Sequence, residues 1–253
     1  LEISIEVSNT PPVVVGVSFG PSPAYIDDTL SCTPTAATDA DGTTKITYTY
    51  GWEVDGVGIA ETTNSLTGDF FEKQQAVACL VTPNDGFDDG EPFTTDSITI
   101  LNSAPAINVV TITPETPIGT DTLTCTWSDY TDLDNDDDLS LIEWSVNGAV
   151  VGTDATLVGV FSGGDGVSCT VTPFDGEDTG APRSSTIVVS QGAPSIGSVT
   201  ITPVPALAAD TLICSHDDFQ DPDGDDDMSR LSWHLNGVEI STDETLFDEF
   251  VGG

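Results

Sequence analysis

Apolar and polar residues alternate along this chain in short runs, which is the pattern of half-buried β-strands. The runs Val109–Thr113 and Ser185–Val189 are rich in β-branched residues, and Gly, Pro and Asp separate such runs from one another. No stretch shows convincing helical periodicity. The pattern therefore predicts an all-β protein.

A set of features recurs around Cys32, Cys125 and Cys214, which lie 93 and 89 residues apart. Each Cys follows an Asp-Thr-Leu lead-in and precedes a Trp by about twenty residues, and an Asp-Gly or Asn-Gly pair comes three residues after the Trp. These residues are Trp52 with Asp55-Gly56, Trp144 with Asn147-Gly148, and Trp233 with Asn236-Gly237. Such pairs supply the positive φ angles of a type I′ hairpin.

The periods divide the chain into repeats. We expect repeat 1 over residues 11–103, repeat 2 over 104–192, and an incomplete repeat 3 over 193–253. Residues 1–10 match the last strand of a repeat and are expected to be the terminal β-strand of a preceding or neighbouring domain. The chain stops before the segment that would carry a partner for Cys214.

The order Cys, Trp, Cys in repeats 1 and 2 resembles that of immunoglobulin-like domains. More narrowly, Tyr50-x-Trp52-x-x-Asp55-Gly56 and Val81–Gly86 resemble the tandem immunoglobulin-like and PKD-like repeats of large microbial extracellular surface or filament proteins. The resemblance implies tandem immunoglobulin-like β-sandwich domains in a linear array. Val77 and Val167 stand where antibody-type domains usually have Tyr, so antibody-type domains are not expected.

The same resemblance implies two cross-sheet disulfides and an oxidising compartment outside the cell. The pairs would be Cys32–Cys79 and Cys125–Cys169, with Cys214 left over. Buried free thiols are the alternative, but the recurrent spacing in two repeats favours pairing.

Charge excludes two classes of partner. The chain has 43 acidic residues against four Lys and Arg, a net charge of −39. Nucleic acid and anionic membrane surfaces both require clustered basic residues. No apolar run approaches the roughly 20 residues that would cross a bilayer, so we expect no membrane insertion in this segment.

In each repeat an acidic loop follows the strand that carries the first Cys. In repeats 1 and 2 a second acidic loop follows the strand that carries the second Cys. Alternate carboxylates around an Asn or Gly turn supply the oxygen ligands that calcium prefers. The predicted calcium ligands are Asp132, Asp134, Asp136 and Asp138; Asp221, Asp223, Asp225 and Asp227; Asp39 and Asp41; Asp85 and Asp88; and Asp175 and Asp178. In an immunoglobulin topology both loops lie at the end of the sandwich that faces the preceding domain, so calcium would stiffen the junctions.

The alternative is a solvated acidic surface that keeps the protein soluble. Repeat 1 has Thr43, Thr44 and Lys45 where the other loops have Asp, so we expect a weaker or absent site there.

Catalysis is not expected. His216 and His234 are the only histidines, they are not clustered, and no nucleophile elbow or phosphate loop is present. The sequence favours a structural protein, a filament or stalk of serial domains, as part of a longer array or a polymer joined head to tail by β-strand complementation. The rivals are an adhesin or glycan-binding region and accessory repeats of a secreted enzyme.

Overall fold

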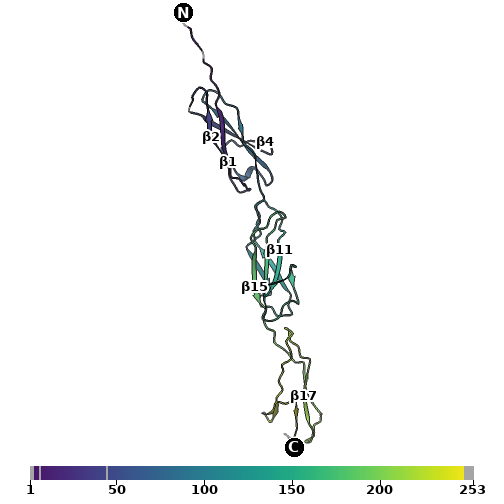
Figure 1. The fold of residues 1–253 in the computed structure, drawn as a ribbon. Coiled ribbons are helices and arrows are strands. Elements are labelled where there is room, and N and C mark those ends of the chain that lie inside the picture. Colours follow the sequence, from purple (N-terminus) through teal and green to yellow (C-terminus); the bar gives the residue numbers. More distant parts are fainter. Residues whose placement is uncertain (1–2, 6, 44, 248–253) are drawn as a thin grey trace. The chain divides into compact units, whose positions relative to one another are not determined.

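The computed structural model describes residues 3–5, 7–43 and 45–247 (Figure 1). These residues form β-strands and a short 3₁₀ turn, η1 (Gly68–Phe70), and no α-helix occurs among them. The prediction of an all-β protein is confirmed. Within the same part of the chain, no helix is long and apolar enough to cross a membrane.

The chain divides into two compact units. Unit 1 comprises Leu1–Ile107, Asp129–Ser140 and Thr172–Ala181, and unit 2 comprises Asn108–Ser128, Leu141–Val171 and Pro182–Gly253. Unit 1 therefore contains repeat 1 together with the acidic loops of repeat 2, and unit 2 contains the strands of repeat 2 together with repeat 3.

Repeat 1 folds as two antiparallel sheets. One has the order β1-β2-β5, and the other has the order β4-β3-β6-β7 with β8 also paired to β6. Their bounds are β1 Val13–Gly20, β2 Leu30–Thr38, β3 Thr47–Val54, β4 Val57–Ile59, β5 Ser65–Leu66, β6 Ala76–Asn84, β7 Phe93–Thr94 and β8 Ile98–Thr99. This two-sheet arrangement is that of an immunoglobulin-like sandwich.

Repeat 2 has the same arrangement in sheets β13-β10-β9 and β12-β11-β14-β15. The bounds are β9 Val109–Thr113, β10 Leu123–Ser128, β11 Leu141–Val146, β12 Ala149–Gly152, β13 Thr156–Leu157, β14 Gly166–Thr172 and β15 Arg183–Val188. The turn between β11 and β12 has positive φ at Asn147 (50°) and Gly148 (84°), as predicted for a type I′ hairpin.

Repeat 3 has the sheet β16-β17-β20 and the pair β18-β19. The bounds are β16 Ser198–Thr202, β17 Leu212–Asp217, β18 Trp233–Leu235, β19 Val238–Ser241 and β20 Thr245–Leu246. In repeat 2 the Trp-bearing strand β11 lies between β12 and β14. Among the described residues β18 pairs only with β19, so its other edge is unpaired.

A buried Trp and a disulfide form the centre of each complete sandwich. Trp52 and Trp144 are 1% and 0% exposed, and each indole N–H donates to a backbone carbonyl ten or eleven residues later along the chain. Trp233 donates in the same way to the Asp243 carbonyl at 2.8 Å. A polar N–H inside the core thereby has a partner, which removes the cost of burying it.

Both implied disulfides are present. Cys32–Cys79 and Cys125–Cys169 each join one sheet to the other, with Cα–Cα distances of 6.4 and 6.3 Å. Cys214, at the equivalent position of repeat 3, is a free and partly buried thiol. The repeated Cys–Trp core and the two-sheet topology establish tandem immunoglobulin-like β-sandwich domains.

Candidate metal site in the acidic loops

The acidic loop of repeat 2 folds around one carboxylate. Asp132 Oδ1 accepts hydrogen bonds from the backbone N–H groups of Asp134 (2.8 Å) and Asp136 (3.2 Å). The chain turns at Asn135, whose φ of 63° lies in the left-handed region that Asn tolerates. As a result, one carboxylate oxygen from each of the three Asp residues lies within 4.8 Å of the other two.

Two oxygens of this cluster have no protein partner. Asp132 Oδ2 and Asp134 Oδ1 are buried and make no hydrogen bond. A cavity of about 400 Å³ opens beside them. It is lined by Tyr130, Thr131, Asp132, Asn135 and Asp136. Buried carboxylate oxygens without a donor are costly, so the loop has the charge, the ligand type and the space for a hard cation.

The segment that leads into repeat 2 is bonded to both of its acidic loops within unit 1. The Asn102 side-chain amide donates to Asp175 Oδ2 (2.8 Å) and Asp178 Oδ2 (3.0 Å). The Ser103 N–H donates to Asp134 Oδ2 (2.6 Å). We call these five residues the linker clasp. Both acidic loops of repeat 2 therefore lie beside the linker that leads into it.

The same clasp precedes repeat 1. The Asn9 amide donates to Asp85 Oδ2 (2.8 Å) and Asp88 Oδ2 (3.0 Å), and the Thr10 N–H donates to Asp41 Oδ2 (2.6 Å). In unit 2, the N–H of Gly192 donates to Asp223 Oδ2 at the equivalent place before repeat 3. Carboxylates that we predicted as calcium ligands therefore also position the linkers.

Hydrogen bonding keeps two of these carboxyl groups ionised. The pKa of Asp85 is lowered by the Asp88 N–H, the Asn9 amide and the Phe87 N–H. Burial raises the pKa of Asp175, but hydrogen bonds led by the Asn102 amide outweigh this and lower it overall. Both groups are therefore negatively charged at neutral pH.

Lys73 adds a positive charge to the repeat 2 cluster. It lies between η1 and β6, and its Nζ contacts Asp136 Oδ2 and lies 3.3 Å from Glu177 Oε1 and 3.0 Å from Asn102 Oδ1. The Asp136 hydrogen bond raises the lysine pKa, burial opposes this, and with the Glu177 contact the pKa reaches about 12. Lys73 is therefore a permanent cation beside the three Asp residues.

The remaining predicted ligands do not form a cluster of three carboxylates among the described residues. Asp138 Oδ1 and Asp227 Oδ1 each accept the N–H of the Ser two residues later. Asp221 Oδ1 accepts the N–H of Asp223 (2.8 Å), so the repeat 3 loop begins like that of repeat 2. Asp39 Oδ2 in repeat 1 is buried without a partner. Among the described residues, three carboxylates converge only at the repeat 2 loop.

Asn9, Asn102 and two glycines also position the linkers, although the sequence pattern did not point to them. A Cβ on Gly90 or Gly180 would lie 1.8 Å from the carbonyl oxygen of Pro12 or Pro105 respectively, so only Gly lets the linker approach. Asn9 and Asn102 recur at the 93-residue period, and this recurrence was the signal available in the sequence.

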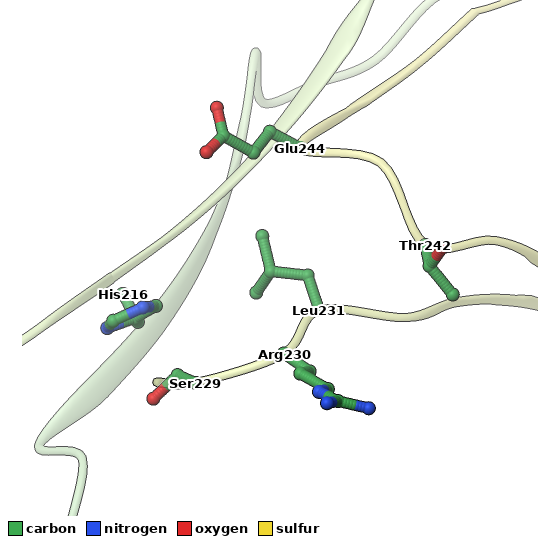
Figure 2. A pocket seen from close by; sticks show the side chains of 6 residues that line it. All are labelled: His216, Ser229, Arg230, Leu231, Thr242 and Glu244. Atoms are coloured by element: carbon green, nitrogen blue, oxygen red, sulfur yellow. The ribbon is translucent and has the colours of Figure 1, made fainter. Parts of the chain in front are cut away.

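A second cavity, of about 460 Å³, lies in repeat 3. Its lining comprises His216, Ser229, Arg230, Leu231, Thr242 and Glu244. Figure 2 shows the Leu231 side chain pointing into this space, whereas Arg230 points away from Glu244. His216 Nε2 lies 3.6 Å from Asp227 Oδ2, which is an ion-pair geometry at a partly exposed surface.

Comparison with known proteins gives a fold likeness only. No protein-family model matches the chain, and no curated protein matches it. Two fibronectin type-III domains of chicken tenascin match 71% of this chain and 100% of their own, at 13% identity and a TM-score of 0.37. Three N-terminal domains of the bacteriophage RB49 outer capsid protein Hoc match 91% and 81%, at 18% identity and a TM-score of 0.29.

Immunoglobulin domains 1–5 of Sidekick-1 match 93% of this chain and 50% of theirs, at 11% identity and a TM-score of 0.37. Identities and scores this low leave the immunoglobulin-like assignment resting on the sheets, Trp residues and disulfides of the chain itself.

Proposed function

We propose that this chain is a non-enzymatic structural segment of an extracellular protein, in which calcium bound by the acidic loops stiffens the connections between successive sandwiches. The observation that carries the proposal is the convergence of Asp132, Asp134 and Asp136, with two buried oxygens that have no hydrogen-bond donor.

The chemistry of the loop favours calcium. Calcium takes roughly six to eight oxygen ligands, from carboxylates, carbonyls and water, in flexible geometry. The three Asp residues offer only oxygen, and the cavity beside them leaves room for water ligands. Ser103 is only 6% exposed, and its hydroxyl group makes no hydrogen bond within the protein. It lies beside this loop, because the Ser103 backbone N–H donates to Asp134.

Calcium in this loop would act on the linker through residues already in contact with it. Asp134 uses one oxygen to hold the Ser103 N–H and keeps its other oxygen without a protein partner. One carboxylate would thus connect the cation to the linker. Neutralising the loop would also reduce the repulsion among its carboxylates, which favours the folded clasp.

An extracellular location is supported by the two disulfides, because such bonds persist in oxidising compartments and are rare in the cytosol. Cys125 and Cys169 are separated by 44 positions in the sequence, and closing a loop of that length stabilises a domain by about 4 kcal/mol in the chain-entropy description.

The test is isothermal titration of the whole chain with CaCl₂ at neutral pH, beside an Asp132→Asn and Asp134→Asn double variant. Asn keeps the size and removes the charge. We expect the double variant to lose at least one calcium site that the native chain has. Equal binding by both chains would refute the site at this loop.

We also propose that chains associate head to tail by β-strand addition, because Ile3, Ile5 and Val7 are 82%, 83% and 82% exposed and alternate as a strand requires. An exposed strand edge of a second copy would accept such a strand. Charged substitutions in the donor should abolish association.

Sedimentation velocity at increasing concentration tests this association. Native chain should form species larger than a monomer, and an Ile3→Asp and Ile5→Asp double variant should not. Val57→Asp, at a position 67% exposed on β4, is the control for added charge. Monomers at all concentrations of native chain would refute strand addition.

A further inference from the structure

Lys73 occupies one side of the acidic cluster, and its position has consequences for any cation that binds there. Its ammonium group contacts Asp136, the third member of the cluster, and its side chain is only 21% exposed. Glu177 and Asn102 hold the same ammonium at 3.3 and 3.0 Å. A cation that takes Asp136 Oδ2 as a ligand must therefore displace this ammonium.

One lysine does not neutralise its surroundings. Asp132 and Asp134 belong to the same cluster, and neither makes an ion pair among the described residues, while Asp136 does. The two oxygens without a donor belong to the first two. Asp132 and Asp134 are therefore available to an added cation, whereas Asp136 is already paired with Lys73.

The next repeat provides a natural comparison. Gly163 stands six residues before Cys169, as Lys73 stands six residues before Cys79. The Gly163 N–H donates to Asp223 Oδ1 at 3.0 Å, and a Cβ there would lie 2.7 Å from that carboxyl group. Because this residue is Gly, the loop of repeat 3 receives no cationic side chain from this position.

We propose that Lys73 is a built-in competitor of calcium at the Asp132–Asp136 loop: its ammonium holds Asp136 when calcium is scarce and is displaced when calcium binds. This inference rests on the proposed function. With Lys73 present, the repeat 2 loop binds calcium more weakly than it would without this lysine. When no calcium is bound, the ammonium group neutralises the charge of Asp136.

Calorimetric titration of the whole chain with CaCl₂, at constant ionic strength and neutral pH, tests the competition. Lys73→Gln removes the ammonium, and Arg183→Gln removes one positive charge from the exposed strand β15 as a matched control. Because a unit charge about 4 Å away contributes at least about 1 kcal/mol, Lys73→Gln should tighten one site about fivefold or more. Arg183→Gln should leave it unchanged.

A second readout follows the lysine itself. Lys45 and Lys73 are the two lysines of the chain, so acetylation of each is resolved by peptide mass spectrometry. Calcium should speed the acetylation of Lys73 relative to that of Lys45, because displacement frees the amine. Unchanged or slower acetylation would overturn the proposal.

The outcomes separate this inference from the proposed function. If native and Lys73→Gln chains bind calcium with equal affinity, or if Lys73→Gln binds more weakly, the competition is wrong and the calcium site stands. If neither chain binds calcium, both are wrong. If only Lys73→Gln binds calcium, the native chain has no calcium site to switch, and both the inference and the proposed function are wrong.

Discussion

Asn102 is the centre of the linker clasp, and its replacement by Asp is the sharpest structural test of that clasp. The native amide donates two hydrogen bonds, at 2.8 and 3.0 Å, to the carboxylates of Asp175 and Asp178. Asp in its place has the same shape but no donor, and it puts a third carboxylate against the other two.

The magnitude follows from these contacts. A hydrogen bond to a charged group contributes about 1.5–3 kcal/mol, and the bond to Asp178 is exposed, so Asn102→Ala should weaken the clasp by about 2 kcal/mol in all. Asn102→Asp adds repulsion of about 1 kcal/mol or more for each neighbouring carboxylate about 4 Å away. Lys73 Nζ, which lies 3.0 Å from Asn102 Oδ1, attracts the new carboxylate and offsets about 1 kcal/mol of this repulsion, so we expect Asn102→Asp to cost about 3 kcal/mol.

Amide hydrogen exchange of Ser103 measures the loss. Its N–H donates to Asp134 within the clasp, so its protection reports whether the linker is bonded to the loop. About 1.4 kcal/mol corresponds to a tenfold change, so protection should fall about 30-fold in Asn102→Ala and further in Asn102→Asp. Asn64→Asp, which adds the same charge at an exposed bend of repeat 1, is the control. Equal protection in Asn102→Asp and Asn64→Asp would refute the reasoning.

Two further substitutions test other contacts. Gly180→Ala places a Cβ 1.8 Å from the Pro105 carbonyl oxygen and should lower the unfolding temperature by several degrees, whereas Gly58→Ala, with open space around it, should change it little; equal melting curves would contradict this. The pKa of Asp165 is lowered by the Asn147 amide and a backbone N–H, so this interaction stabilises the fold above pH 3.8 and is lost as pH falls through the depressed pKa. Asp165→Asn should therefore lose less stability than native chain in urea unfolding between neutral and acid pH, and identical pH profiles would argue against it.

Much of the fold was predictable because the same short sequence motifs recur in each repeat. The β-branched runs, the Asn-Gly turns and the Cys–Trp–Cys order each specify a local geometry, and the structure has all of them: the strands, the positive φ at Asn147 and the two disulfides. The division into two compact units was not predicted. Its bounds follow the hydrogen bonds between the acidic loops of repeat 2 and the linker, and the recurrence of Asn9 and Asn102 marks the donors of these bonds without identifying the acceptors.

The acidic loops were predicted only in part. Alternating carboxylates around Asn135 indicated convergence, and the structure brings Asp132, Asp134 and Asp136 together. The sequence pattern predicted a calcium site in the loops of both repeat 2 and repeat 3. Among the described residues, however, three carboxylates converge only in the loop of repeat 2. The role of Lys73 depends on a contact across 63 residues of sequence, which no local rule reveals.

Small-angle X-ray scattering of the whole chain, in calcium and in a calcium chelator at matched ionic strength, tests the central claim most directly. If calcium bound by the acidic loops stiffens the connections between sandwiches, the distribution of interatomic distances will be narrower in calcium and will broaden on chelation. The same change should be reduced in the Asp132→Asn and Asp134→Asn double variant. Identical scattering in calcium and chelator would contradict the account.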